Sequence, residues 1–219
     1  MKTEGFTMVE LLVASAAALL VVAMMSSLYP THARAFAAGR DTQELRATLR
    51  RVADGIAREI RGLGFDPIDD PSDPSGFDGA SDGLAVAEAA RIEVRSDLHG
   101  ASPGTAPDDR LDWGSSERVS FHRSTSTQGI LQAIGGFASP LCDAVVVREG
   151  GLRFRYLDAC GDELVPPAGA SLAIAERRRV AAVEVTLSAE HEASRRSETV
   201  VGRTALRNRL ALRCPVAGP

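Results

Sequence analysis

The sequence predicts an α+β fold, with a long N-terminal helix whose second half packs on an antiparallel β-sheet head. Two observations predict it. An apolar N-terminal stretch leads directly into a segment with helical periodicity, and short segments of the remaining chain alternate apolar and polar residues. A length of 219 residues suits one substantial domain plus an extra element rather than two ordinary domains.

The N-terminal stretch has the length and composition of a membrane span. Between Phe6 and Leu28 the only ionisable side chain is that of Glu10. About 20 apolar residues in a helix cross the hydrocarbon core of a bilayer. The rest of the chain has the composition of a soluble protein, so we expect a single-span protein that carries one globular head.

An amphipathic helix is expected after the span. Pro30 should kink the helix or loosen one turn where it leaves the bilayer. Apolar residues then recur at intervals of three or four, and the charged residues fall mainly on the other side. Gly62 and Gly64 weaken this pattern and Pro67 ends it. The apolar stripe, which we expect to pack on the protein's own sheet, consists of Leu45, Leu49, Val52, Ile56, Ile60 and Leu63.

The head reads as a loop followed by short strands. Residues 66–83 form a loop by composition, and their six aspartates raise a calcium site as a hypothesis. No EF-hand spacing is present and no glutamate closes the segment, so we expect a solvated acidic loop without a metal. An antiparallel meander against the helix gives an α+β head. The expected strands are residues 91–95, 118–122, 152–156, 183–187 and 199–212.

The chain has three cysteines, Cys142, Cys160 and Cys214. A turn at Gly150-Gly151 would place Cys142 nearly opposite Cys160 at the open end of a hairpin. We therefore expect a Cys142–Cys160 disulfide with Cys214 as the odd thiol, and a Cys160–Cys214 bridge is the alternative. No CxxC pair is present to indicate zinc or thioredoxin-like chemistry.

No pattern in the sequence indicates an enzyme. HExxH, GxSxG, P-loop and Rossmann patterns are absent. The net charge of −4 provides no basic field for gripping nucleic acid, although the run Arg177-Arg178-Arg179 leaves a DNA contact open as an alternative to a solvated lead-in to a strand. We expect no catalytic residue, no cofactor and no small-molecule substrate. The histidines, isolated in sequence, are His32, His99, His122 and His191.

The residues before the apolar stretch differ from an ordinary signal peptide. A secretory signal has its small-residue cleavage site after the apolar region, whereas Gly5 precedes it, in Gly-Phe-Thr-Met-Val-Glu-Leu-Leu-Val. This pattern resembles the class III signal of type IV prepilins and pseudopilins. In that family a membrane peptidase cuts after the glycine and methylates the new N-terminus. The resemblance implies cleavage between Gly5 and Phe6 and methylation of Phe6.

Glu10 is expected to act in subunit assembly. A carboxylate at the centre of an apolar span costs about 2.5 kcal/mol or more, so Glu10 needs a partner. Cleavage would create a cationic amine on Phe6, and this amine on a neighbouring subunit can pair with Glu10 and set the register of helix on helix. The alternative is an uncleaved signal anchor in which Glu10, near the end of the span, reaches water.

Three further segments resemble PilW-type minor pilins. Residues 58–67 are similar to the end of their helix, residues 151–161 to a strand in the middle of their head, and residues 206–208 to the end of their last strand. J-type pseudopilins of type II secretion share much of this layout, so that family is kept as an alternative.

The resemblance implies both an organisation and a function. It divides the chain into a leader (1–5), a membrane-spanning polymerisation helix (6–29), an amphipathic helix (30–65) and a β-rich head (66–219). The protein would be a minor pilin of the inner membrane, with its head in the periplasm, that helps prime a type IV pilus and lies near its tip. Its partners would be other minor and major pilins, the prepilin peptidase, the assembly platform and membrane lipid. The alternatives are a J-type pseudopilin and a membrane-anchored binding or DNA-uptake tip subunit.

Overall fold

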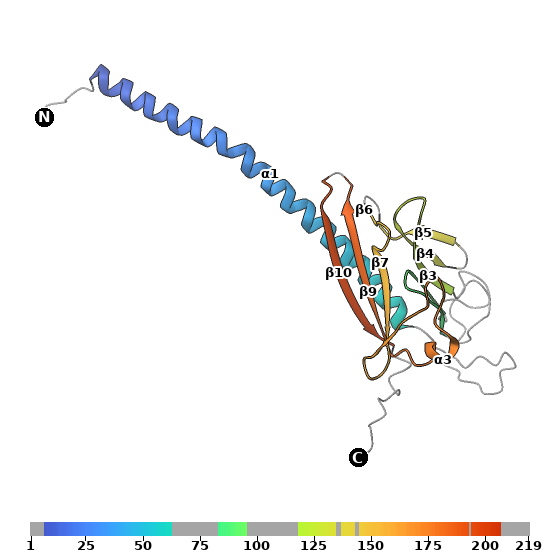
Figure 1. Cartoon of the computed structure of the whole chain (residues 1–219). Coiled ribbons are helices and arrows are strands. Elements are labelled where there is room, and N and C mark those ends of the chain that lie inside the picture. The colour runs from blue at the N-terminus through green and yellow to red at the C-terminus, as the bar shows by residue number, and fades with distance from the viewer. Residues whose placement is uncertain are drawn as a thin grey trace, which may run out of the picture. The chain divides into compact units, whose positions relative to one another are not determined.

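The computed structural model describes residues 7–62, 83–95, 118–134, 137–142, 145–192 and 194–206. These residues form a long helix, a short helix and ten strands in two antiparallel sheets (Figure 1). The α+β class is confirmed, but the head has two sheets where the sequence predicted one. The chain forms two compact units, residues 1–43 and 44–219, so the second half of the long helix belongs to the head.

Helix α1 (Met8–Arg61) contains both the apolar stretch and the amphipathic segment without a break. It continues through Pro30, where the missing N–H removes one backbone hydrogen bond but does not end the helix. The helix ends at Arg61, and the N–H of Gly62 donates to the carbonyls of Arg58 and Glu59 at 3.3 and 3.1 Å. The predicted end of the helix near its glycines is therefore confirmed, although the expected boundary at residue 65 lies outside the described residues.

The first sheet is a meander in which each strand pairs with the next along the chain. Its inner face carries Ile92, paired with Phe121, and Val94, paired with Val119. The predicted strand over residues 91–95 is confirmed at both ends. The strands are β1 (Leu84–Ala87), β2 (Arg91–Arg95), β3 (Arg118–Arg123), β4 (Ile130–Ile134) and β5 (Phe137–Pro140).

The second sheet has the order β10-β9-β7-β8, and β6 also pairs with β9. The short helix α3 (Ile174–Arg177) precedes β9. Strands expected at 152–156, at 183–187 and from 199 are present, while residues 207–212 of the last expected strand lie outside the described chain. The strands are β6 (Val145–Val146), β7 (Leu152–Leu157), β8 (Glu163–Leu164), β9 (Ala182–His191) and β10 (Ser197–Ala205).

The hairpin expected around Gly150-Gly151 is not formed. Val145 of β6 pairs with His191 and Leu152 of β7 pairs with Leu187, so β6 and β7 follow one another along the same edge of β9. The turn between them presses onto β9, where a Cβ on Gly151 would lie 2.4 Å from the carbonyl oxygen of Ser188. Long-range pairing with β9 has therefore replaced the local pairing that the glycines suggested.

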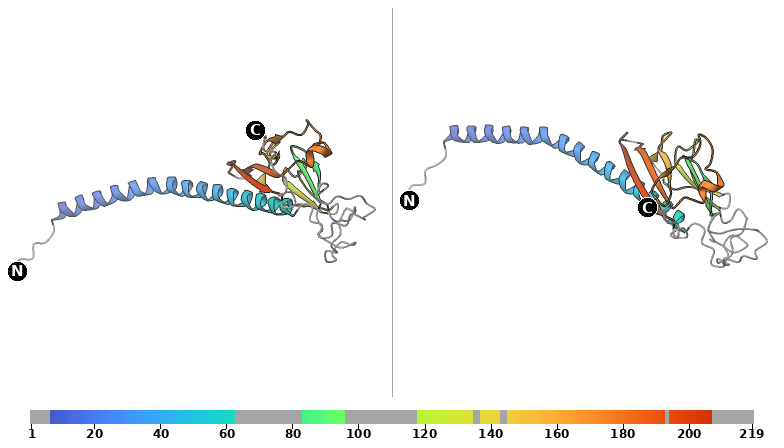
Figure 2. Two further views of the ribbon diagram at one scale, coloured as in Figure 1. Left: turned by 90° about the horizontal axis from the view of Figure 1, so that it is seen from below. Right: turned by 60° about the horizontal axis from the view of Figure 1, so that its bottom comes forward.

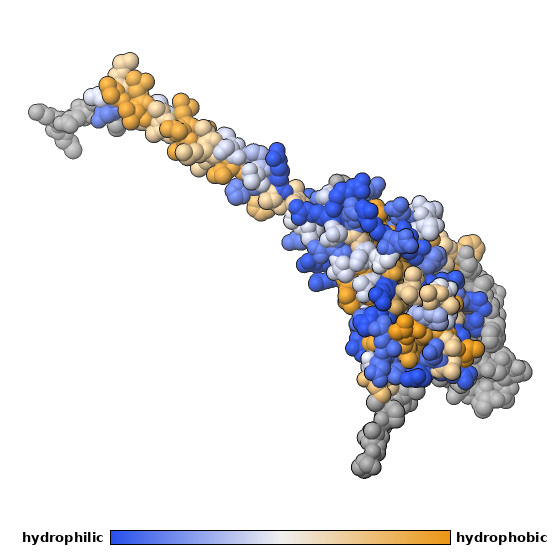
Figure 3. Space-filling view, viewed as in Figure 1, coloured by the Kyte–Doolittle hydropathy of each residue, from blue (hydrophilic) through white to orange (hydrophobic). Residues whose placement is uncertain are grey.

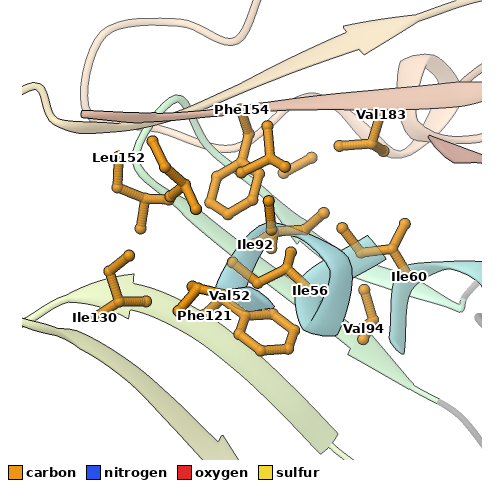
Figure 4. Close-up of a cluster of buried hydrophobic side chains, with 14 of the residues drawn as sticks. Val52, Ile56, Ile60, Ile92, Val94, Phe121, Ile130, Leu152, Phe154 and Val183 are labelled. Carbon is orange, nitrogen blue, oxygen red and sulfur yellow. The ribbon is translucent and has the colours of Figure 1, made fainter. Parts of the chain in front are cut away.

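The core lies where α1 meets both sheets. Figure 4 shows Val52, Ile56 and Ile60 of α1 among side chains from strands of the two sheets, and Figure 2 shows the end of α1 against these strands. This confirms that the stripe packs on the protein's own head, although Leu63 lies outside the described residues. The buried residues of the helix, at most 4% exposed, are Leu45, Leu49, Val52, Ala53, Ile56 and Ile60.

Strand β7 also ties the two sheets together by hydrogen bonds. The hydroxyl of Tyr156, fully buried, donates to the carbonyl of Glu88 at 2.8 Å. The N–H of Phe154 donates to the carbonyl of Ala89 at 2.8 Å. Both acceptors lie in the turn between β1 and β2, so this turn is held on the second sheet as well as in the first.

Replacing Ile56 by alanine is expected to lower the free energy of unfolding by about 2–5 kcal/mol, because the side chain is fully buried between helix and sheets. Val201→Ala, at a side chain 58% exposed, should change it by less than about 0.5 kcal/mol. Denaturant unfolding of the chain in detergent micelles measures both. Equal effects of the two substitutions would contradict this assignment of the core.

Candidate functional site

The N-terminal part of α1 presents a long apolar surface. Among the described residues, one helix is long and apolar enough to cross a membrane, and it is α1. Its large apolar side chains from Met8 to Tyr29 are all exposed by more than half (Figure 3). Apolar surface of this extent requires a cover of lipid or of other helices. The candidate functional site is therefore this helix and its polar N-terminus.

A capping box closes the N-terminus of α1. The carboxylate oxygen Oε2 of Glu10 accepts the backbone N–H and the hydroxyl of Thr7, both at 2.9 Å. In return, Thr7 Oγ1 accepts the N–H of Glu10 at 3.3 Å. These bonds satisfy donors that the first turn of a helix leaves open, and the acidic group also lies at the positive end of the helix dipole. Thr7-x-x-Glu10 is a readable capping-box signature, and it gives Glu10 a partner within the chain that was not predicted.

The other two predicted residues of this site, Gly5 and Phe6, lie outside the described chain. Cleavage between them and methylation of Phe6 therefore stay predictions. Glu10 lies in the first turn of α1 and is exposed. The structure brings Glu10 together with Thr7, and pairing of Glu10 with a neighbouring amine is likewise still a prediction.

The cysteines do not follow the predicted pairing. Cys160, in the turn after β7, is disulfide-bonded. Cys142 is partly buried and does not belong to that bond. The prediction of a Cys142–Cys160 bridge is corrected, because it assumed the hairpin register that β9 prevents. The alternative that the sequence left open, Cys160–Cys214, involves a residue outside the described chain.

Asp158, Cys160 and Asp162 gather within 4.8 Å of one another but form a turn rather than a metal centre. Asp158 Oδ1 accepts the N–H groups of Cys160 and Asp162 at 2.9 and 3.0 Å, and its Oδ2 accepts Arg179 at 3.0 Å. Burial raises the pKa of the Asp158 carboxyl, but these donors outweigh it, so the pKa lies below its ordinary value. The Cys160 sulfur is already used in the disulfide. The aspartates of the expected acidic loop, residues 66–82, lie outside the described chain.

The arginine run is mostly structural. Arg177 lies in α3, and its Nη1 donates to the carbonyls of Leu84 and Ala85 on β1. Arg179 pairs with Asp158 at 3.0 Å, and both Arg178 and Arg179 are exposed. The run precedes β9 and is partly solvated, as a lead-in to a strand would be, but the side chains of Arg177 and Arg179 are also bonded within the fold.

A hollow of about 360 Å³ lies beside the β6–β7 turn, against β9 and the start of β10. Its charged wall is one network, in which Glu190 pairs with Arg148 at 2.6 Å and with Arg195 at 3.5 Å. The hydrogen bond and positive charge of Arg148, with those of Arg195, hold the pKa of the Glu190 carboxyl below its ordinary value. No nucleophile–base pair lines this hollow among the described residues.

No family model and no curated protein matches the sequence. The function is therefore argued from the chemistry of the helix and the head.

Thr7→Ala is expected to open the capping box and destabilise the first turn of α1 by about 0.5–2 kcal/mol. Amides of residues 8–10 should then exchange with solvent several-fold faster in detergent micelles, whereas Thr7→Ser, which keeps the hydroxyl, should exchange like the unsubstituted chain. Identical exchange in the alanine and serine variants would show that the cap does not stabilise the helix.

The Glu190 network predicts a pH dependence of stability. Since the folded-state pKa of Glu190 lies below its ordinary value of 4.5, the ionised carboxylate stabilises the head above that value, and this contribution is lost as pH falls through the folded-state pKa. Glu190→Gln should therefore be less stable at neutral pH, and the difference should shrink below about pH 4. Denaturant unfolding at several pH values measures it, and a constant difference across the range would contradict the ion pairing.

Proposed function

We propose that this chain is a minor pilin, cut between Gly5 and Phe6, methylated on Phe6 and built into a type IV pilus through α1. The observation that carries the proposal is that the two parts of α1 differ. The first part is exposed and apolar with one acidic residue at its start, and the second part contributes buried side chains to the core of the head. A filament subunit needs both an apolar assembly segment and a folded head.

The apolar part of α1 supports a role in helix–helix assembly. In a bilayer its exposed side chains face lipid, and in a filament the same side chains can pack against helices of other subunits. A membrane anchor alone needs only the apolar span. It does not need the span to continue as one helix into a segment that forms part of the core of the head.

The geometry at Glu10 supports an intermolecular pair. Both bonds from Thr7 go to Oε2 of Glu10, and a carboxylate has acceptor capacity on both oxygens. Oε1 can therefore accept the Phe6 amine of a neighbouring subunit without loss of the cap. In apolar surroundings this charge-assisted bond favours one relative position of two helices over all others.

The head supports a structural role. The polar clusters of the described chain are engaged in turns and ion pairs, as at Asp158 and Glu190. A DNA-uptake function is disfavoured because Arg177 and Arg179 are bound within the fold. A J-type pseudopilin of type II secretion would use the same helix and cap, so it stays the alternative, and it differs in where the processed protein is found.

Replacing Gly5 by leucine is expected to abolish cleavage, because the peptidase must reach a backbone that no side chain covers. The protein would then keep residues 1–5, which intact-mass measurement of the membrane-extracted chain detects. Gly39→Leu is the matched control, since Gly39 lies on an open face of α1 with nothing within 4 Å, and it should be processed normally. Normal processing of the Gly5 variant would exclude the proposed cleavage site.

A further inference from the structure

Strand β10 is an open edge of the second sheet. It pairs with β9 over nine consecutive residues without a register shift, and no described strand pairs with its other side (Figure 1). A strand at the edge of a sheet presents a row of N–H and C=O groups that another chain can pair with. A nine-residue edge is long, so its unpaired groups require an explanation.

The register shows which groups of β10 face outward. Across the β9–β10 pair, the N–H of His191 donates to the carbonyl of Arg196, and the N–H of Leu206 donates to the carbonyl of Ala181. On the other side of β9, the N–H of Ser188 donates to the carbonyl of Gly151. The N–H and C=O groups of successive residues in an antiparallel strand point to opposite edges, so the even-numbered residues of β10 bond to β9. The outward groups therefore belong to residues 197, 199, 201, 203 and 205.

The edges formed by β1, β5 and β8 are protected. On β1, the carbonyls of Leu84 and Ala85 accept Arg177, and the N–H and carbonyl of Ala87 bond to Ser171 and Leu172. Strand β8 has two residues, and β5 has four and ends in Pro140. Cover, shortness and proline are the means by which proteins keep edges from pairing.

Strand β10 lacks these protections. It contains no proline, no lysine and no bulge, and its charged residues, Glu198 and Arg203, lie toward its two ends. Val201 at its middle is 58% exposed. Among the described edge strands, β10 is therefore the longest and the one that lacks these protections.

Helix α1 specifies the chemistry of the incoming strand. Three contacts place β10 alongside α1: Arg46 with Glu198 at 3.0 Å, Ala53 beside Gly202, and the Ala57 carbonyl with the Thr204 hydroxyl at 3.4 Å. Arg50 and Arg61 each follow one of these helix residues by four positions, which places them about 40° further around the helix, beyond the edge of β10. Both are exposed, and neither has an ion pair with a described residue.

We propose that the β10 edge binds an extended segment of a different pilus subunit, which adds a strand to the sheet and presents carboxylates to Arg50 and Arg61. This inference rests on the proposed function. The two arginines lie about 16 Å apart along the helix, the length of about five strand residues, so the carboxylates occupy helix-facing positions four or six residues apart. The described edge strands of a second copy, β1, β5, β8 and β10, do not fit this requirement, because none of them carries two acidic residues.

The test compares two variants with matched controls in cells that make the filaments. Val201→Pro removes an outward N–H but none that bonds to β9, and Val201→Ala keeps that N–H. Arg50→Glu with Arg61→Glu reverses the charge beside β10, and Arg51→Glu with Arg58→Glu makes the same change on the far side of the exposed face. The amount of each chain in sheared filaments is measured, and leader cleavage is followed in the same samples.

The amount of the Val201→Pro variant and of the Arg50→Glu, Arg61→Glu variant in filaments should be about tenfold lower than that of the unsubstituted chain. The amount of each control variant should stay within about twofold of it. Normal cleavage with equal incorporation of all four variants would overturn the edge proposal and leave the minor-pilin proposal standing. Absence of cleavage in every sample would instead remove the proposed function itself.

Hydrogen exchange of the unsubstituted chain keeps the test decisive if the proline variant does not fold. Amides of residues 199, 201 and 203 should exchange at least about tenfold more slowly in filaments than in micelles, while those of 198, 200 and 202 are protected in both. Equal exchange of the outward amides in the two states would overturn the proposal. Protection that arises in the pure protein at high concentration would assign the edge to a second copy and also overturn it.

Discussion

The structure depends on the burial of one side of α1 between two sheets. Ile56 and its neighbours on the helix meet the inner faces of β2 and β3 on one side and of β7 and β9 on the other (Figure 4). The inner residues of both sheets belong to the same buried cluster as this row of helix side chains. The helix whose first part is long and apolar enough to cross a membrane therefore also contributes its second part to the core of the head.

This shared helix explains the remaining features of the head. Because α1 occupies the space between the sheets, its opposite side is left to charged residues, and β10 lies along the boundary between the two. The hydroxyl of Thr204 and the small surface of Gly202 allow β10 to lie close to Ala53 and Ala57. The flank of the helix beyond β10 and the edge of this strand thus form one continuous surface, on which the proposed strand would bind.

Local features of the fold could be predicted from the sequence, and long-range ones could not. The apolar stripe, the end of α1 near Gly62 and the bounds of β2 follow from periodicity and from residues a few positions apart. The pairing of β6 with β9 depends on residues more than 40 positions away, and β1 and β8 are too short to show alternation. The division of the strands into two sheets could not be predicted for the same reason. Alternation shows that a strand has two faces, but it does not show which strand lies beside it.

The candidate site divides in the same way. The long apolar stretch and its single acidic residue could be predicted because composition alone defines them, and the capping box of Thr7 and Glu10 was readable but overlooked. The cysteine pairing failed because it relied on a hairpin that long-range contacts replaced. The structural use of Arg177 and Arg179 could not be predicted, since their partners on β1 and after β7 are distant in sequence.

The central claim is that α1 is the assembly element of a processed filament subunit. Mass spectrometry of sheared surface filaments and of membranes from the same cells tests it most directly, through the N-terminal peptide of this chain. The account predicts a peptide that begins at methylated Phe6 in the filaments. Processed peptide confined to the membranes would indicate the secretion pseudopilin, and an intact Met1 terminus in both fractions would contradict the account.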